Sequence, residues 1–189
     1  MHKQLGRPRR RFPVGALVVG GILIAVVVVF VAVVVIDVRE RAGSKAPNGV
    51  TSFSKLSRGH TKGGVNYAQT PPVGGNHDPG WQNCGFYSQP VRNENGVHSL
   101  EHGAVWITYQ PVLPRDQVEK LRNLTDKSYM LASPYPGLPA AVVVSAWGKQ
   151  LKLDSAGDPR LEQFVSTYRQ GPQTPEPGAP CTGGVGNPG

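Results

Sequence analysis

The sequence predicts an α+β protein in which a single N-terminal transmembrane helix precedes a small domain. Residues 14–36 carry no charged side chain, which is typical of a membrane span. The chain after them alternates short runs of β-branched and aromatic residues with two amphipathic helical patterns, separated by loops rich in glycine and proline. We therefore expect a mostly antiparallel sheet with two packed helices and long ordered loops.

The apolar segment 14–36 is long enough to cross a bilayer once. At 1.5 Å per residue it reaches about 34 Å, against a hydrocarbon core of roughly 30 Å. A cleaved signal peptide is the alternative, but its apolar region would be shorter and would end in a small-x-small cleavage site. Residues 1–13 are basic and lack acidic side chains, so they should be cytoplasmic. The C-terminal domain would then lie outside the cell membrane.

The net charge of +8 argues less for a nucleic-acid partner than it first suggests. Five of those charges belong to residues 1–13, which leaves three for the rest of the chain. No cluster of Lys and Arg interleaved with aromatic residues remains there to follow a phosphate backbone. We expect a membrane, and a protein of the cell envelope, as partners rather than nucleic acid.

The two cysteines, Cys84 and Cys181, lie far apart and outside any C-x-x-C spacing. In an extracytoplasmic compartment one disulfide closing a long loop is expected. Such a bond would stabilise the fold by about 4–5 kcal/mol in the chain-entropy model. Two unpaired thiols are the alternative.

Composition divides the rest of the chain into a linker, a domain and a tail. Residues 37–57 should form a linker, residues 58–181 the α+β domain, and residues 182–189 a disordered tail. Within the domain, Val118, Leu121 and Leu124 give one helix an apolar stripe. A last helix should begin with Asp158 as N-cap and Pro159 in its first turn.

The stretch 97–111 and the loop 71–87 hold the candidate site. His98 and His102 are four residues apart, so they share a face in either a helical turn or a strand. A buried strand should follow them from Ala104 to Tyr109. The His-x-x-x-His spacing suits one metal ion, and His77 and His60 are further ligands. Glu101 would orient an imidazole from behind the ligands. The alternative is a turn that Glu101 merely stabilises.

Five short motifs make the domain resemble the "domain of unknown function 3105" family of bacterial membrane-anchored proteins. They are PPVGGNH (71–77), W-x-x-C-G-x-Y (81–87), VHSLEHG (97–103), SAWG (145–148) and PE-x-x-x-x-C (175–181). These motifs cover about residues 58–181, and VHSLEHG is highly specific. The family more often has serine before the second glycine of the first motif. The resemblance implies a domain outside the cytoplasm and supplies no reaction.

These observations predict a membrane-anchored extracytoplasmic protein that binds Cu or Zn. The ligands would be His77, His98 and His102, with His60 as a fourth. One alternative is a non-catalytic partner of an envelope complex. A metal-dependent hydrolase is another, but no serine nucleophile elbow, phosphate-binding loop or dinucleotide fingerprint accompanies the histidines.

Overall fold

The computed structural model describes residues 14–43 and 46–189, with side chains in the first helix described only at Gly20 and residues 22–35. The chain divides into two compact units after Gly43. The predicted cytoplasmic tail, residues 1–13, lies outside the described residues.

The first unit contains helix α1, which spans Val14–Gly43 and so includes the start of the predicted linker. Its described apolar side chains are exposed, with Phe30 at 67%. Among the residues that the structure describes, no helix is both long enough and apolar enough to cross a membrane. The transmembrane span therefore stays a prediction.

The second unit is built on one mixed six-stranded sheet in the order β1-β6-β5-β3-β4-β2. The strands are β1 (Thr51–Ser52), β2 (Gly85–Phe86), β3 (Val105–Tyr109), β4 (Met130–Pro134), β5 (Val142–Ala146) and β6 (Lys149–Leu153). The pairs β1–β6, β6–β5 and β5–β3 are antiparallel. Strand β4 runs parallel to both of its neighbours, β3 and β2. The sheet is therefore mixed: three of its five strand pairings are antiparallel, in line with the predicted mostly antiparallel sheet, and the two pairings of β4 are parallel.

Three helices pack in this unit, one more than predicted. They are α2 (Asn93–Glu101), α3 (Arg115–Leu124) and α4 (Pro159–Tyr168). Helix α4 starts as predicted, because the Asp158 side chain accepts a hydrogen bond from the Arg160 backbone N–H and Pro159 is the first helical residue. The added helix is α2, which forms where the sequence left a helical turn and a strand open.

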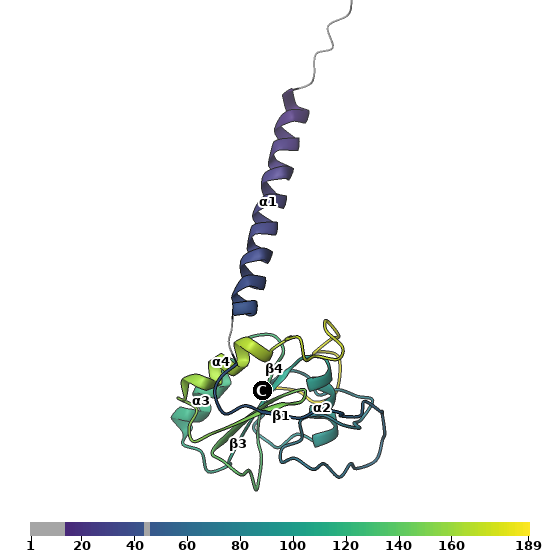
Figure 1. Ribbon diagram of the computed structural model, residues 1–189, viewed down its shortest axis with the longest axis vertical. Coiled ribbons are helices and arrows are strands. Elements are labelled where there is room, and N and C mark those ends of the chain that lie inside the picture. The colour runs from purple at the N-terminus through teal and green to yellow at the C-terminus, as the bar shows by residue number, and fades with distance from the viewer. Residues whose placement is uncertain (1–13, 44–45) are drawn as a thin grey trace, which may run out of the picture. The chain divides into compact units, whose positions relative to one another are not determined.

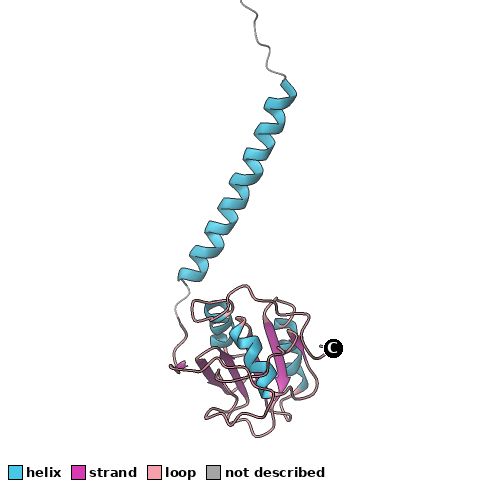
Figure 2. Ribbon diagram, turned by 90° about the vertical axis from the view of Figure 1, so that its right-hand side faces the viewer, coloured by secondary structure: helices cyan, strands magenta, loops and turns pink. Residues whose placement is uncertain are grey.

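The helices cover both faces of the sheet. One core cluster joins the sheet to α3 and α4 through Ile107, Leu121 and Phe164, and a second joins it to α2 through Leu100 and Trp106. Figures 1 and 2 show the sheet between these helices. Every residue of β3, β4 and β5 is buried, as expected for strands covered on both sides.

Two segments predicted to lack regular structure instead pair with the domain. Strand β1, in the predicted linker, pairs with β6. Residues 182–189, predicted to be disordered, lie along the loop 81–86. There Val185 exchanges backbone hydrogen bonds with Trp81 and Asn83, and the Gly189 N–H donates to the Phe86 carbonyl. The glycine- and proline-rich composition of these two segments describes only the segments themselves, so it could not indicate which distant residues they pair with.

Candidate metal centre

Helix α2 is held close to the sheet by a glycine. Gly96 faces Trp106, and a Cβ placed on it would lie 2.7 Å from the tryptophan ring. The apolar side chain of Leu100 belongs to the same buried cluster. His98 and Glu101, three residues apart, then share another face of the helix.

The loop 71–87 is tied to α2 by hydrogen bonds. The Gln82 N–H donates to the Asn95 carbonyl, and the Ser99 hydroxyl donates to the Gln82 carbonyl at 2.7 Å. The Asn95 amide donates to the carbonyl of Gly80. These bonds bring His77 of the loop against the helix, so the two histidine-bearing segments of the sequence do meet.

His60 reaches the same place through a backbone contact with His77. The Thr61 N–H donates to the His77 carbonyl at 2.7 Å, and the His77 N–H donates to the Gly59 carbonyl at 3.0 Å. His77 is fully buried, while His60 is exposed. The histidine cluster therefore has one side that reaches solvent.

Three imidazoles and one carboxylate converge. The ring centroids of His60, His77 and His98 lie 4.7–5.0 Å from one another. One ligand atom from each of these histidines and one from Glu101 all lie within 4.8 Å of one another. We name His60, His77, His98 and Glu101 the inner cluster.

Hydrogen bonds set the tautomers of two of these histidines. Nδ1 of His77 lies 2.8 Å from the Gly75 carbonyl oxygen, and Nδ1 of His98 lies 2.7 Å from that of Asp78. A carbonyl can only accept, so each Nδ1 carries the proton and donates it. In the neutral ring this leaves a lone pair on Nε2. Histidine ligands of metals are oriented by hydrogen bonds of this kind.

His77 and Glu101 approach each other without forming a hydrogen bond. Nε2 of His77 lies 2.9 Å from Oε2 of Glu101, and the two side chains are 0% and 1% exposed. Both atoms are buried and neither has a hydrogen-bond partner of acceptable geometry. A lone pair and a carboxylate oxygen facing each other at this distance require a cation or a shared proton to be stable.

The environment of His98 favours a neutral ring. The pKa of His98 is lowered from 6.5 to about 4, mainly by burial; the hydrogen bond to the Asp78 carbonyl opposes this shift, and the nearby His102, His77 and His60 add to it. The imidazole is therefore uncharged near neutral pH, which is the form that binds metals.

His102 does not belong to the inner cluster, although its ring centroid lies 4.5 Å from that of His98. Its Nδ1 donates to the Pro180 carbonyl at 2.6 Å, and its Nε2 lies 3.8 Å from Oε2 of Glu176. The sequence prediction grouped His102 with the other histidines and placed Glu101 behind them. The geometry puts Glu101 among the candidate ligands and sets His102 to one side. The choice of ligands stays a prediction.

The three-residue spacing between His98 and Glu101 could have suggested that Glu101 lies among the candidate ligands. His98 and Glu101 share a face only if the segment is helical, and the sequence left a helix and a strand open. Once α2 is known to be a helix, the i,i+3 relation identifies Glu101 as a neighbour of His98.

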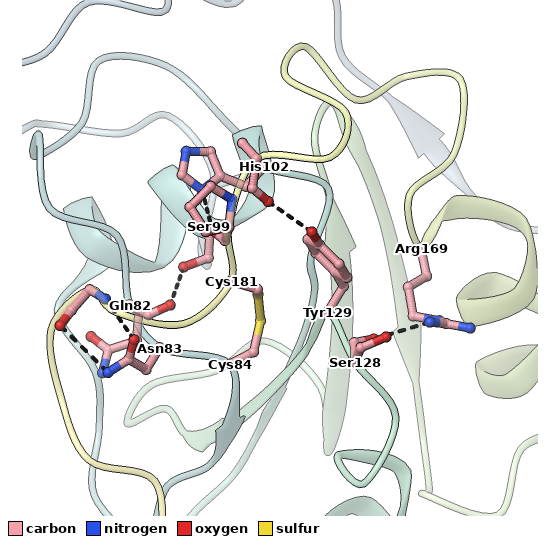
Figure 3. Close-up of a disulfide and its surroundings, with 12 residues drawn as sticks. Gln82, Asn83, Cys84, Ser99, His102, Ser128, Tyr129, Arg169 and Cys181 are labelled. Carbon is pink, nitrogen blue, oxygen red and sulfur yellow. Dashed lines mark hydrogen bonds between the residues drawn. A yellow bond between two sulfur atoms is a disulfide. The ribbon is translucent and has the colours of Figure 1, made fainter.

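The predicted disulfide between Cys84 and Cys181 is confirmed. It joins residues 97 apart in sequence, with Cα atoms 5.4 Å apart, and the Cys84 N–H donates to the Cys181 carbonyl at 2.7 Å. Figure 3 shows the disulfide between the loop that contains Gln82 and the C-terminal segment, with His102 close by. The bond anchors the loop of His77 to the C-terminal segment.

A family model described as "Protein of unknown function (DUF3105)" matches residues 60–183 of this chain. The match includes every residue of the inner cluster, His102 and both cysteines. No curated protein and no solved structure matches the chain.

Proposed function

The chain belongs to the DUF3105 family of proteins of unknown function, and we propose that its domain binds a divalent transition-metal ion, Zn²⁺ or Cu²⁺. His60, His77, His98 and Glu101 are the proposed ligands. The contact between His77 and Glu101 carries this proposal, because a divalent cation between these two buried atoms would satisfy both.

Burial strengthens the argument. An ionised carboxylate is costly to bury unless a cation pairs with it. Among the described residues, the only basic group within ion-pair distance of Glu101 is His77. The His77 Nδ1 proton already goes to Gly75, and its Nε2 lacks hydrogen-bond alignment with the carboxylate. A metal ion supplies the missing positive charge without requiring that alignment.

The ligand types favour zinc or copper in the divalent state. Imidazole nitrogens suit Zn, Cu, Fe and Ni, whereas Cu(I) is selected by soft thiolate and thioether ligands. Both cysteines of the chain are joined in the disulfide, so neither offers a thiolate. The carboxylate of Glu101 is a harder ligand than a thiolate or a thioether. Ligand atoms around tetrahedral zinc lie roughly 3.3 Å apart, so a pair as wide as 4.8 Å would close by about 1.5 Å when the ion binds.

Four protein ligands favour binding over catalysis. They would fill a tetrahedral coordination sphere, as in structural zinc sites, whereas catalytic sites keep one position for water or substrate. For this reason metal binding is proposed in preference to metal-dependent hydrolysis. The role of partner in an envelope complex stays a prediction.

The direct test is a metal titration of the full chain purified without a histidine tag. We expect uptake of Zn²⁺ or Cu²⁺ against a competing chelator, and a strong loss of affinity in His77→Ala and Glu101→Gln. The matched controls are His2→Ala, outside the described residues, and Glu119→Gln on α3, whose side chain is 63% exposed. Unchanged affinity in Glu101→Gln would exclude the proposed ligand set.

We also propose that the domain lies outside the cytoplasm, tethered to the cell membrane by residues 14–36 with the N-terminus inside. The support is the uncharged sequence of that segment and the disulfide, since disulfides persist in oxidising compartments. Alkaline extraction should leave the chain in the membrane fraction. Protease added to spheroplasts with an intact cell membrane should digest the domain. Release by alkali would contradict the anchor.

A further inference from the structure

We infer that His102 and Glu176 form a second, outer metal position next to the inner cluster, binding the same class of divalent transition-metal ion more weakly. The inference rests on the proposed function, since it assigns a second ion to the same protein. It gives a role to the one described histidine outside the inner cluster and to a glutamate of the C-terminal segment.

His102, like His77 and His98, is oriented by a hydrogen bond from its Nδ1 to a backbone carbonyl. Its side chain is 4% exposed, and its Nδ1 donates to the Pro180 carbonyl at 2.6 Å. In the neutral ring the Nε2 lone pair is then free. Nε2 lies 3.8 Å from Oε2 of Glu176, which is too long for a hydrogen bond. Two ligand atoms on one zinc ion lie only slightly closer, roughly 3.3 Å apart.

The C-terminal segment holds Glu176 in place. The Glu176 N–H donates to the Glu101 carbonyl at 3.1 Å, at the end of α2. Four residues further on, the Pro180 carbonyl accepts the hydrogen bond from Nδ1 of His102, and the next residue, Cys181, is disulfide-bonded to Cys84. Figure 3 shows His102 beside this segment and the disulfide. The ring of His102 and the backbone of Glu176 are therefore held by contacts made independently of any metal.

The outer position adjoins the inner cluster on one side and is partly open to solvent. The ring of His102 is adjacent to that of His98, with centroids 4.5 Å apart, while the Glu176 side chain is 52% exposed. The ring of Trp81 lies against both histidines, at 5.1 Å from His102 and 5.8 Å from His98. Two protein ligands leave the remaining coordination to water, so the ion should bind weakly and exchange readily.

The test is the stoichiometry of Zn²⁺ binding by the full chain, with the disulfide intact and no histidine tag. Competition with a chromophoric chelator and elemental analysis after gel filtration should show two phases, one tight and one weaker. We expect Glu176→Gln and His102→Gln to weaken the second phase at least tenfold and to leave the first unchanged. Glutamine at position 102 can still donate to Pro180, and Glu176 is exposed, so both variants should fold.

Each result decides the matter. Two phases of which only the weaker responds to both variants support the outer position, with Glu119→Gln as the unaffected control. A single bound ion in the parent protein overturns the outer position and leaves the inner cluster standing. A second phase that persists in both variants also overturns it. No uptake at all removes the inner cluster as well, so the failure of the two proposals can be told apart.

Discussion

Nε2 of His77 and Oε2 of Glu101 face each other at 2.9 Å inside the protein, and neither atom has a hydrogen-bond partner of acceptable geometry. The His77 ring is fixed by its Nδ1 donation to the Gly75 carbonyl, and Glu101 is fixed at the end of α2. A cation between the two atoms would turn a destabilising contact into a stabilising one.

This contact predicts opposite effects of Glu101→Gln with and without metal. In the presence of a chelator the substitution should leave the free energy of unfolding unchanged or raise it by about 1 kcal/mol, because the amide can donate to Nε2 of His77. With Zn²⁺ at about 100 times the dissociation constant, the parent protein should gain about 2.7 kcal/mol, and the variant should lose most of that gain. Urea denaturation with and without Zn²⁺ measures both effects. An equal gain in the variant would contradict the ligand role.

Gly96→Ala should destabilise the domain, although alanine is ordinarily the better helix former. The added methyl group would lie 2.7 Å from the Trp106 ring, so α2 must move away from β3. We expect a loss of about 1–3 kcal/mol in urea denaturation, as for overpacked cores. Gly157→Ala is the control, because a Cβ there meets nothing closer than 3.8 Å. Equal stabilities for the two variants would refute the packing argument.

Removing the disulfide should lower the stability of the domain. Cys84 and Cys181 are 97 residues apart, and closing a loop of that length contributes about 4–5 kcal/mol in the chain-entropy model. The double variant Cys84→Ser/Cys181→Ser should unfold at correspondingly lower urea concentration. A reductant should bring the parent protein to the same midpoint and leave the double variant unaffected. A reductant-insensitive parent would show that the bond does not contribute.

The cap of α4 should make stability depend on pH in the acid range. Hydrogen bonds from Arg160, first from its side chain and then from its backbone, lower the pKa of Asp158 from 3.8. The unfolded state therefore binds the proton more readily, so the contribution is present above about pH 4 and is lost as the pH falls further. Asp158→Asn keeps a capping side chain but not the charge. The stability difference between parent and variant should shrink between about pH 5 and pH 2. A constant difference over that range would contradict the assignment.

Features that depend on local chemistry could be predicted from the sequence alone. Asp158 and Pro159 mark the start of α4, and β-branched runs mark β3 and β5, because caps and side-chain shape act on the residues next to them. The two cysteines and the histidine-bearing segments were also identifiable. Their residue types predicted a disulfide and a candidate metal site, with unpaired thiols and a purely structural turn as the alternatives.

Tertiary structure alone decided which side chains converge. Helix α2 is short and contains Asn93, Asn95 and Gly96, so it depends on packing against the sheet rather than on its own propensity. That packing, with the hydrogen bonds between Gln82 of the loop and Ser99 of α2, brings Glu101 to His77. It leaves His102 3.8 Å from Glu176. The parallel pairing of β3 with β4 likewise joins segments separated by α3. Such contacts depend on residues far apart in the chain, and spacing within one segment cannot specify them.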